Sequence, residues 1–234
     1  MKKNINIAII PARIGSKRVK RKNIKLFGNK PIIKRTFETI KKSKIFNEIV
    51  LSSDSDKILA LGKKIGFTKL IKRPKKLSDD YTGTKEVIAH AIKILKKKTN
   101  ISNVCCVYPC NPFLQIRDLK KAFNLIKNNR KSFFLSISNY SHPTERAFFF
   151  NKRNNRIKNI NNKFSEFRTQ DIIPKYFDAG QFYLASKTIW LKKKITNKIG
   201  IVIPSWRVVD IDTIEDWKRA ELFYKFLKKE KLIK

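Results

Sequence analysis

Acidic residues, histidine and cysteine are scarce in this sequence of 234 residues. Only 18 Asp and Glu stand against 55 Lys and Arg, with two histidines and three cysteines. Cys105 and Cys106 are adjacent, and neighbouring residues of a strand point to opposite faces, so these two are poorly placed to bridge each other. No C-x-x-C pair includes Cys110 and neither histidine lies nearby, which argues against a zinc site. We expect buried, reduced thiols and an intracellular compartment.

Long hydrophobic runs are also missing, and none approaches the length that spans a bilayer. The first apolar run, Ile7 to Ile10, ends at Pro11 and is too short for the core of a signal peptide. We therefore expect a cytoplasmic protein without a membrane partner. Hydrophobic residues still make up 41 %, which is enough for a proper core. Because no repeat or linker appears, we expect a single domain over residues 1–234.

The shortage of carboxylates leaves a formal net charge of +37. Such an excess commonly marks nucleic-acid binding, but a nucleic-acid-binding module predicts clustered charge with interleaved aromatics. Here the lysines are spread along the whole chain, together with abundant Asn and Ile, which share A/T-rich codons. Nucleic-acid binding is therefore a remote alternative, and we expect no nucleic-acid partner. The charge should nevertheless steer anionic substrates toward the protein.

Strand-like and helix-like segments alternate along the chain. Short apolar runs predict strands at residues 6–10, 48–52, 69–71, 103–108 and 132–138. Apolar residues spaced by three and four predict helices that begin at Pro31 and cover residues 56–65, 84–95 and 117–128. This order is typical of an α/β fold with a mostly parallel sheet and helices on both faces, which binds its ligand at the carboxyl ends of the strands.

The alternation breaks over residues 139–177, a stretch with many phenylalanines and polar residues and no helical period. We interpret it as an inserted excursion of short strands and loops. The pattern resumes with predicted strands at residues 180–185, 199–203 and 208–211. A last helix is expected from Thr213, where Thr213 and Asp216 resemble a capping box.

A basic loop follows the first predicted strand, in the stretch IPARIGSKRVKRKN from Ile10 to Asn23. Gly15 and Ser16 allow a tight turn with unhindered N–H groups. Six cations surround that turn: Arg13, Lys17, Arg18, Lys20, Arg21 and Lys22. Backbone donors together with cations suit a polyphosphate. The loop matches neither a Walker P-loop nor a dinucleotide-binding fingerprint. A merely solvated basic loop is the alternative, because lysine is common throughout the chain.

Asp210 and Asp212 form a second group near the C-terminus. At i and i+2 on a strand end, two aspartates project to the same face. Close carboxylates repel unless a cation lies between them, and Mg²⁺ carrying a nucleoside triphosphate would suit them. The alternative role for Asp212 is to cap the last helix.

Together these segments resemble the CMP-sialic acid synthetase family, cytidylyltransferases that activate nine-carbon sugar acids. The resemblance covers nearly the whole chain. It is carried, in the family's order, by the basic loop and by SSDSD from Ser52, RPKKLSDDYTGT from Arg73, YPCNPF from Tyr108, RTQD from Arg168, DAGQFY from Asp178 and VVDIDTIEDW from Val208. Several of these segments look most similar to the pseudaminic acid branch.

The resemblance implies a Rossmann-like, GT-A-like nucleotidyltransferase sheet and transfer of CMP from CTP to a nonulosonic acid, with release of pyrophosphate. It also implies site residues. Catalytic roles would fall to Arg13, Lys22 and Asp212, and Mg²⁺ binding to Asp210 and Asp212. Nucleotide contacts would come from Ala12, Arg13, Gly15, Ser16, Lys17, Lys22, Asn23, Asp80 and Thr84, and sugar contacts from Tyr108, Arg168, Gln181 and Tyr183.

The chain departs from the family pattern in four places. Ile14 stands where a small residue is usual, and Lys20 where proline is usual. Tyr108 and Leu114 replace the glutamine and arginine that are common in members using neuraminic acid, which favours another nonulosonic acid. Neuraminic, legionaminic and keto-deoxy-octulosonic acids are the alternative substrates. Residues 139–177 match the segment through which relatives dimerise, so we expect a homodimer; a minor core within one chain is the alternative.

Overall fold

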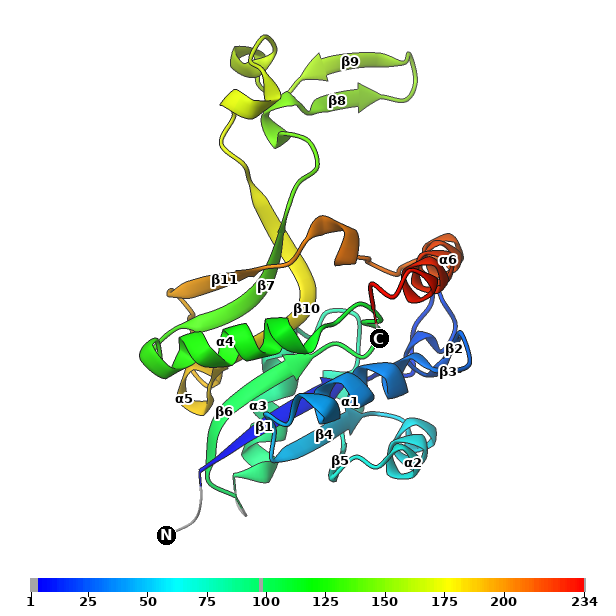
Figure 1. Cartoon of the computed structure of the whole chain (residues 1–234), viewed down its shortest axis with the longest axis vertical. Helices are drawn as coiled ribbons and strands as arrows, with labels where there is room; N and C mark the ends of the chain where they lie inside the picture. The colour runs from blue at the N-terminus through cyan, green and yellow to red at the C-terminus, as the bar shows by residue number, and fades with distance from the viewer. Residues whose placement is uncertain (1–3, 97–98, 234) are drawn as a thin grey trace.

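A twisted sheet of seven strands forms the centre of the computed structural model, which describes residues 4–96 and 99–233 (Figure 1). The strand order is β11-β7-β10-β6-β1-β4-β5. β10 is antiparallel to both of its neighbours, while the other four pairs are parallel. This confirms the predicted mostly parallel sheet. The strands are β1 (Ile5–Pro11), β4 (Glu48–Ser53), β5 (Lys69–Lys72), β6 (Ile101–Val107), β7 (Phe133–Asn139), β10 (Tyr176–Ser186) and β11 (Lys198–Val202).

Helices cover both faces of this sheet. The main helices are α1 (Ile32–Ser43), α2 (Asp56–Ile65), α3 (Thr84–Leu95), α4 (Ile116–Asn128), the short α5 (Lys187–Trp190) and α6 (Ile214–Lys229). Helices α1, α2 and α4 bury their apolar stripes in one core, and α3 and α5 pack in a second core across the sheet. Cys105 belongs to the first core and Cys106 to the second, so the two thiols do point to opposite faces.

Local signals at the helix ends agree with the sequence. The Ser55 side chain accepts a hydrogen bond from the Ile58 N–H at the start of α2, and Gly66 ends that helix with a φ of 103°. At the start of α6, Thr213 and Asp216 form the reciprocal capping box predicted from the sequence. Within the part of the chain that is described, no helix combines the length and the apolar character needed to cross a bilayer.

A third, smaller core joins the basic loop to the last helix. Val19 from the loop packs with Trp217 of α6 and with Phe27, which lies in a two-stranded ribbon. The ribbon consists of β2 (Leu26–Phe27) and β3 (Lys30–Pro31). The third core therefore fixes the basic loop beside the segment that carries Asp210 and Asp212.

One predicted strand is wrong. Residues 208–211 form no strand; they leave the sheet after β11 and lead into α6. Pro204 has no N–H to continue the ladder, and a single 3₁₀ turn, Ser205–Arg207, redirects the chain. The apolar residues that suggested a strand pack instead in the third core, where Ile211 is buried. Asp210 and Asp212 therefore lie on a loop that is not paired within a sheet.

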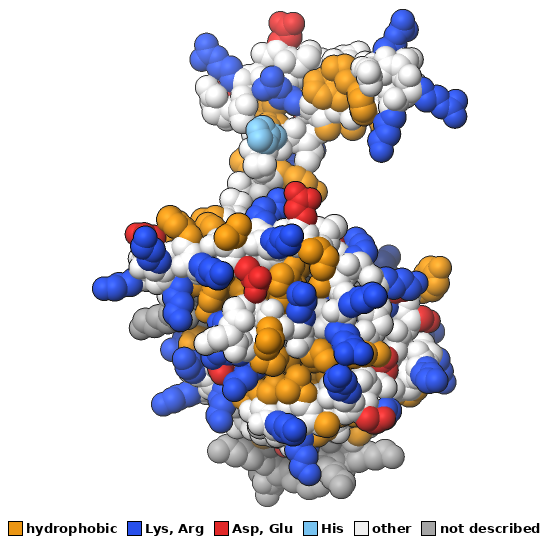
Figure 2. Space-filling view, turned by 90° about the vertical axis from the view of Figure 1, so that its right-hand side faces the viewer, with side chains coloured by type: hydrophobic (Ala, Val, Ile, Leu, Met, Phe, Trp, Pro, Cys, Tyr) orange, Lys and Arg blue, Asp and Glu red, His pale blue; other side chains and the backbone are white. Residues whose placement is uncertain are grey.

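Residues 139–177 form an arm that projects from the body between β7 and β10 (Figure 1). Its tip is a hairpin of β8 (Phe148–Asn151) and β9 (Arg156–Asn159). The side chains of Phe148, Phe149 and Phe150 are 53–65 % exposed, so they do not form a core within the arm. In Figure 2 hydrophobic side chains gather on the arm, whereas Lys and Arg are scattered over the visible face of the whole molecule.

Candidate active site

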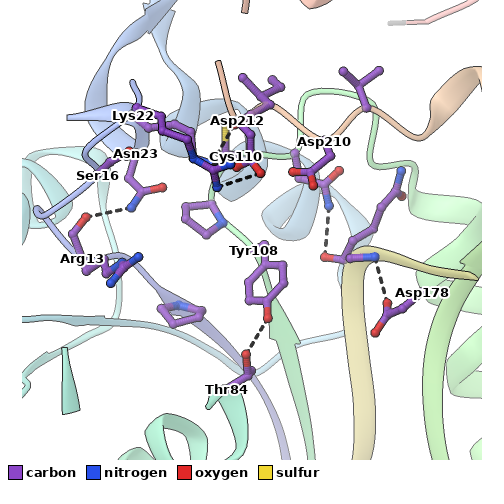
Figure 3. Close-up of a pocket in the computed structure, with 18 of the residues that line it drawn as sticks. Arg13, Ser16, Lys22, Asn23, Thr84, Tyr108, Cys110, Asp178, Asp210 and Asp212 are labelled. Carbon is purple, nitrogen blue, oxygen red and sulfur yellow. Dashed lines mark hydrogen bonds and ion pairs between the residues drawn. The ribbon is translucent and has the colours of Figure 1, made fainter. Parts of the chain in front are cut away.

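A cleft of about 920 Å³ opens at the carboxyl edge of the sheet, where the basic loop meets the loops after β5 and β6 (Figure 3). Its far wall is made by the start of β10 and by residues 207–212. The volume is near the upper end for small-molecule sites. The sequence-predicted residues that line it are Arg13, Ser16, Lys17, Lys22, Asn23, Asp80, Thr84, Tyr108, Gln181, Asp210 and Asp212.

The basic loop contributes Arg13 and Lys17, and both cations meet the loop after β5. Asp80 accepts from Lys17 Nζ at 2.7 Å and pairs with an Arg13 guanidinium nitrogen at 2.7 Å. Arg13 also donates to the Asp79 carbonyl at 2.6 Å. Hydrogen bonds from Lys17, then from Arg13, lower the pKa of Asp80. The Asp80 carboxylate therefore lies between two cations, Arg13 and Lys17. Phosphate oxygens would suit the same position.

Lys22 lies deeper in the cleft, in the short 3₁₀ helix Lys22–Ile24. Its ammonium donates to the Ile211 carbonyl at 2.7 Å and pairs with Asp212 at 3.3 Å. Arg18 pairs with the other oxygen of Asp212 at 2.8 Å. Asn23 is buried and donates to the Arg13 carbonyl at 2.8 Å, which holds the basic loop in its turn. The loop and the Asp212 segment thus contact each other directly.

Asp210 and Asp212 both line the cleft, as expected, although on a loop instead of a strand. Asp212 does not cap α6, because the capping box is formed by Thr213 and Asp216. Partial burial, then the nearby Asp212 carboxylate, raises the pKa of Asp210. Two repelling carboxylates with oxygen donors fit a hard divalent cation. Among residues 4–96 and 99–233 no three His, Cys, Asp or Glu side chains gather as a metal site.

The opposite side of the cleft is less basic. The hydroxyls of Thr84 and Tyr108 are hydrogen-bonded to each other, and the Tyr108 ring packs edge-on against Tyr183. Burial raises the pKa of both tyrosines, so each hydroxyl stays protonated at neutral pH. The Tyr183 hydroxyl donates to Asp178 at 2.8 Å. This wall offers hydroxyls and a carboxylate, which suit a polyhydroxylated ligand.

Four predicted site residues do not line the cleft. Ala12 is buried beneath the basic loop, and no side-chain atom lies within 4 Å of where a Cβ would stand on Gly15. Tyr183 lies behind Tyr108 and Asp178. Arg168 is exposed on the arm, away from the cleft of its own chain.

The structure shows where the two residues of the basic loop that depart from the family pattern, Ile14 and Lys20, lie. Ile14 packs against the first core, and its N–H donates to Asp54 at 3.1 Å. Lys20 and Arg21 are exposed and do not line the cleft.

Sequence reasoning gave no role to several residues of the cleft, among them Arg73, Asn111, Asp178 and Arg207. Arg73 is 5 % exposed, and burial lowers its pKa. Its place directly after β5, at the carboxyl edge, was a signal that could have identified it. Arg207 is 1 % exposed, and only the tertiary fold brings it to the cleft wall. Neither histidine lines the cleft.

The mostly parallel sheet, with a cleft at its carboxyl edge where cations lie beside two carboxylates, is typical of the class of nucleotide-binding α/β proteins. Comparison with known proteins is more specific. The family model described as Cytidylyltransferase matches residues 7–231. The chain belongs to this cytidylyltransferase family, and it is a nucleotidyltransferase that uses CTP.

Two relatives and one solved structure illustrate the likeness. The chain is 39 % identical to pseudaminic acid cytidylyltransferase of Campylobacter jejuni, over 94 % of this chain and 96 % of the relative. It is 34 % identical to a bifunctional pseudaminic acid cytidylyltransferase and hydrolase of Helicobacter pylori, over 88 % of this chain and 40 % of that protein. The fold matches CMP:2-keto-3-deoxy-manno-octonic acid synthetase complexed with CTP, with a TM-score of 0.70, 12 % identity and coverage of 96 % and 99 %.

Proposed function

We propose that this protein transfers CMP from CTP to pseudaminic acid, releasing pyrophosphate and forming the CMP-sugar. The observation that carries the proposal is the two-sided cleft. One side has the cations Arg13, Lys17 and Lys22, and the other has hydroxyl and carboxylate groups, with the two aspartates facing both. The 39 % identity to a pseudaminic acid cytidylyltransferase selects the sugar.

On the basic side, the triphosphate of CTP would be bound by Arg13, Ser16 and Lys17. These groups combine side-chain cations with the exposed backbone of the Gly15 turn. Binding would separate Asp80 from Arg13 and Lys17, because phosphate oxygens compete for the same cations. Lys22, Asn23 and Asp80 are further nucleotide contacts that we assign, and Thr84 would reach the nucleotide from the Tyr108 side of the cleft. Ala12 and Gly15 do not line the cleft, so they would act on the nucleotide only by shaping the turn.

The reaction is an in-line displacement at the α-phosphorus. The oxygen of the anomeric hydroxyl forms a bond to the α-phosphorus, and the hydroxyl proton passes to water. The bond from that phosphorus to the bridging oxygen breaks, and pyrophosphate leaves with the electron pair. Lys22, between the basic loop and Asp212, is placed to neutralise charge on the transferred group. Arg13 would orient the leaving pyrophosphate. Fixing both reactants in one cleft removes most of the entropic barrier.

Asp210 and Asp212 are the residues that would hold Mg²⁺. When bound, this cation would neutralise the triphosphate and help orient it. Asp212 is paired with Arg18 and Lys22, so two cations offset the charge of this carboxylate.

The sugar would lie against β10 and Tyr108. We assign Tyr108, Gln181 and Tyr183 to this side, with Tyr183 acting through Asp178. Arg168 lies on the arm and does not line the cleft of its own chain. We propose that the exposed phenylalanines of the arm pack against a second copy, as an inserted dimerisation segment of the single domain, so that Arg168 meets the partner's sugar. Since CTP is a cytoplasmic nucleotide, we place the reaction in the cytoplasm.

A pyrophosphate-release assay with the four nucleoside triphosphates, each paired with pseudaminic, legionaminic, neuraminic or keto-deoxy-octulosonic acid, tests nucleotide and sugar together. We expect the highest kcat/KM for CTP with pseudaminic acid. Preference for keto-deoxy-octulosonic acid would contradict the proposed sugar but retain the reaction. No release with any pair would contradict the proposed function itself.

The metal assignment has a separate test. We expect Asp212→Ala to abolish Mg²⁺-dependent pyrophosphate release. The variant should stay folded, as judged by circular dichroism and its thermal transition. Glu215→Ala, an exposed carboxylate on α6 outside the cleft, is the matched control and should keep full activity. Undiminished turnover in the Asp212 variant would exclude a role for this residue in metal binding.

A further inference from the structure

A buried chain of polar groups joins three segments of the cleft wall. Asn111 Nδ2 donates to the Gln181 carbonyl at 3.0 Å, and Gln181 Nε2 donates to the Arg207 carbonyl at 2.8 Å. The Arg207 guanidinium then binds both carboxylate oxygens of Asp118, one of them at 3.1 Å. All four residues are buried, with Arg207 only 1 % exposed.

These contacts connect parts of the chain that are distant in sequence. Asn111 follows β6, Asp118 lies in the first turn of α4, and Gln181 belongs to β10. Arg207 ends the 3₁₀ turn that leads into residues 208–212. The segment with both aspartates is thus connected through Arg207 to the sheet and to a helix of the first core.

The segment needs such an anchor because it has no strand partner. Its C-terminal end is fixed where Asp216 accepts from the Asp212 N–H at 3.2 Å and Lys22 donates to the Ile211 carbonyl. Its N-terminal end is fixed by Arg207, three residues before Asp210. Between these ends Val208 packs against the first core and Val209 against the third core, whereas Asp210 has no strand partner. A displaced Arg207 would therefore move Asp210 first.

Stability alone does not explain a buried ion pair in this position. Removing two charges from water is expensive, and well-packed apolar residues of similar volume commonly stabilise a protein as well or better. The bidentate contact instead fixes the orientation of a planar guanidinium.

We propose that Asp118 and Arg207 are positioning residues, which hold Asp210 and Asp212 in place for the divalent cation that accompanies CTP. This inference rests on the proposed function for the identity of the metal site. If Asp118 and Arg207 position the two aspartates, their removal lowers metal affinity; removal of an ion pair with a purely structural role would not. Loss of groups that orient metal ligands commonly lowers metal affinity or activity by about 10- to 100-fold.

The double variant Asp118→Leu/Arg207→Met tests this without leaving an unpaired buried charge. Binding of Mn²⁺ in the presence of CTP, followed by electron paramagnetic resonance, is the readout, with the thermal transition measured in parallel. We expect Mn²⁺ affinity to fall about 10- to 100-fold while the chain stays folded. The double variant Lys30→Met/Glu38→Leu removes a half-buried ion pair outside the cleft and should leave Mn²⁺ affinity unchanged.

Arg207→Lys is a second test variant, because it keeps the positive charge opposite Asp118 but loses the bidentate contact of the guanidinium. We expect an intermediate Mn²⁺ affinity, and this variant decides the question if the double variant does not fold. Wild-type affinity in either folded variant would overturn the positioning role and leave the proposed function intact. Failure of the wild-type chain to bind Mn²⁺ with CTP would overturn both the metal assignment and the positioning role.

Discussion

Among the six cations of the basic loop, Lys22 should matter most for catalysis, and Lys22→Met tests this while keeping most of the aliphatic stem. Lys22 has the contact to the Ile211 carbonyl at 2.7 Å and the pairing with Asp212 at 3.3 Å, whereas Lys20 on the same loop is exposed. Lys20→Met is the matched control. It removes the same charge from the same loop, so the long-range electrostatic effect is equal in the two variants.

The effect of Lys22→Met on stability should be modest. Removing a hydrogen bond from a charged donor costs about 1–3 kcal/mol, and Asp212 keeps its pairing with Arg18. For a chain of this size each kcal/mol lowers Tm by roughly 2–4 °C. The Tm of the variant should therefore lie only a few degrees to about 12 °C below that of wild type.

The effect on the rate should be much larger. Loss of one preorganised donor to a developing negative charge costs about 10²- to 10³-fold in kcat, or about 2.7–4 kcal/mol of activation free energy. We expect this loss for Lys22→Met and less than a threefold change for Lys20→Met in the pyrophosphate-release assay. A Lys22→Met variant within tenfold of wild type, or an equal loss in Lys20→Met, would refute the reasoning.

Three further predictions concern the arm, the thiols and the basic loop. Phe149→Asp should convert the proposed dimer to a monomer in light scattering, whereas Phe226→Asp, on the exposed side of α6, should not; a monomeric wild type would contradict the arm's role. Burial raises the pKa of Cys110 to about 12, so only about one thiol in ten thousand is ionised at pH 8, and native protein should react with iodoacetamide far more slowly than unfolded protein. Asp80→Asn should tighten inhibition by pyrophosphate about two- to tenfold, since Arg13 and Lys17 lose a competing carboxylate. The bonds from Lys17 and Arg13 lower the pKa of Asp80, so its charge persists in mildly acid solution and this difference should remain at pH 5; equal inhibition of both proteins would contradict it.

The fold could be predicted largely from the sequence because its strands and helices carry their own signals. The apolar runs of β1, β4 and β6, and the three- and four-residue spacing in α3 and α4, gave elements that agree within two residues with the structure. The run at residues 208–211 misled because an apolar segment has the same composition whether it pairs in a sheet or fills a small core. Only the place of Pro204 and the packing of α6 distinguish the two cases.

The cleft was predictable only in part. The basic loop after β1 and the pair Asp210 and Asp212 were found by position and charge, although the strand expected to carry the pair does not form. The family resemblance selected Arg13 and Lys22 from the six cations, and the structure brings these residues to one cleft. Arg207 and Asp118 could not be found, since they are 89 positions apart and each resembles an ordinary surface charge in sequence. Their importance depends on burial, which is a property of the tertiary fold.

Mass spectrometry of the product formed from CTP and pseudaminic acid shows directly whether the protein transfers CMP to this sugar. We expect a new species with the mass of the sugar joined to one CMP unit, formed together with one equivalent of pyrophosphate. A product that retains more than one phosphate, or CTP and sugar recovered unchanged under conditions where the chain is folded, would contradict it.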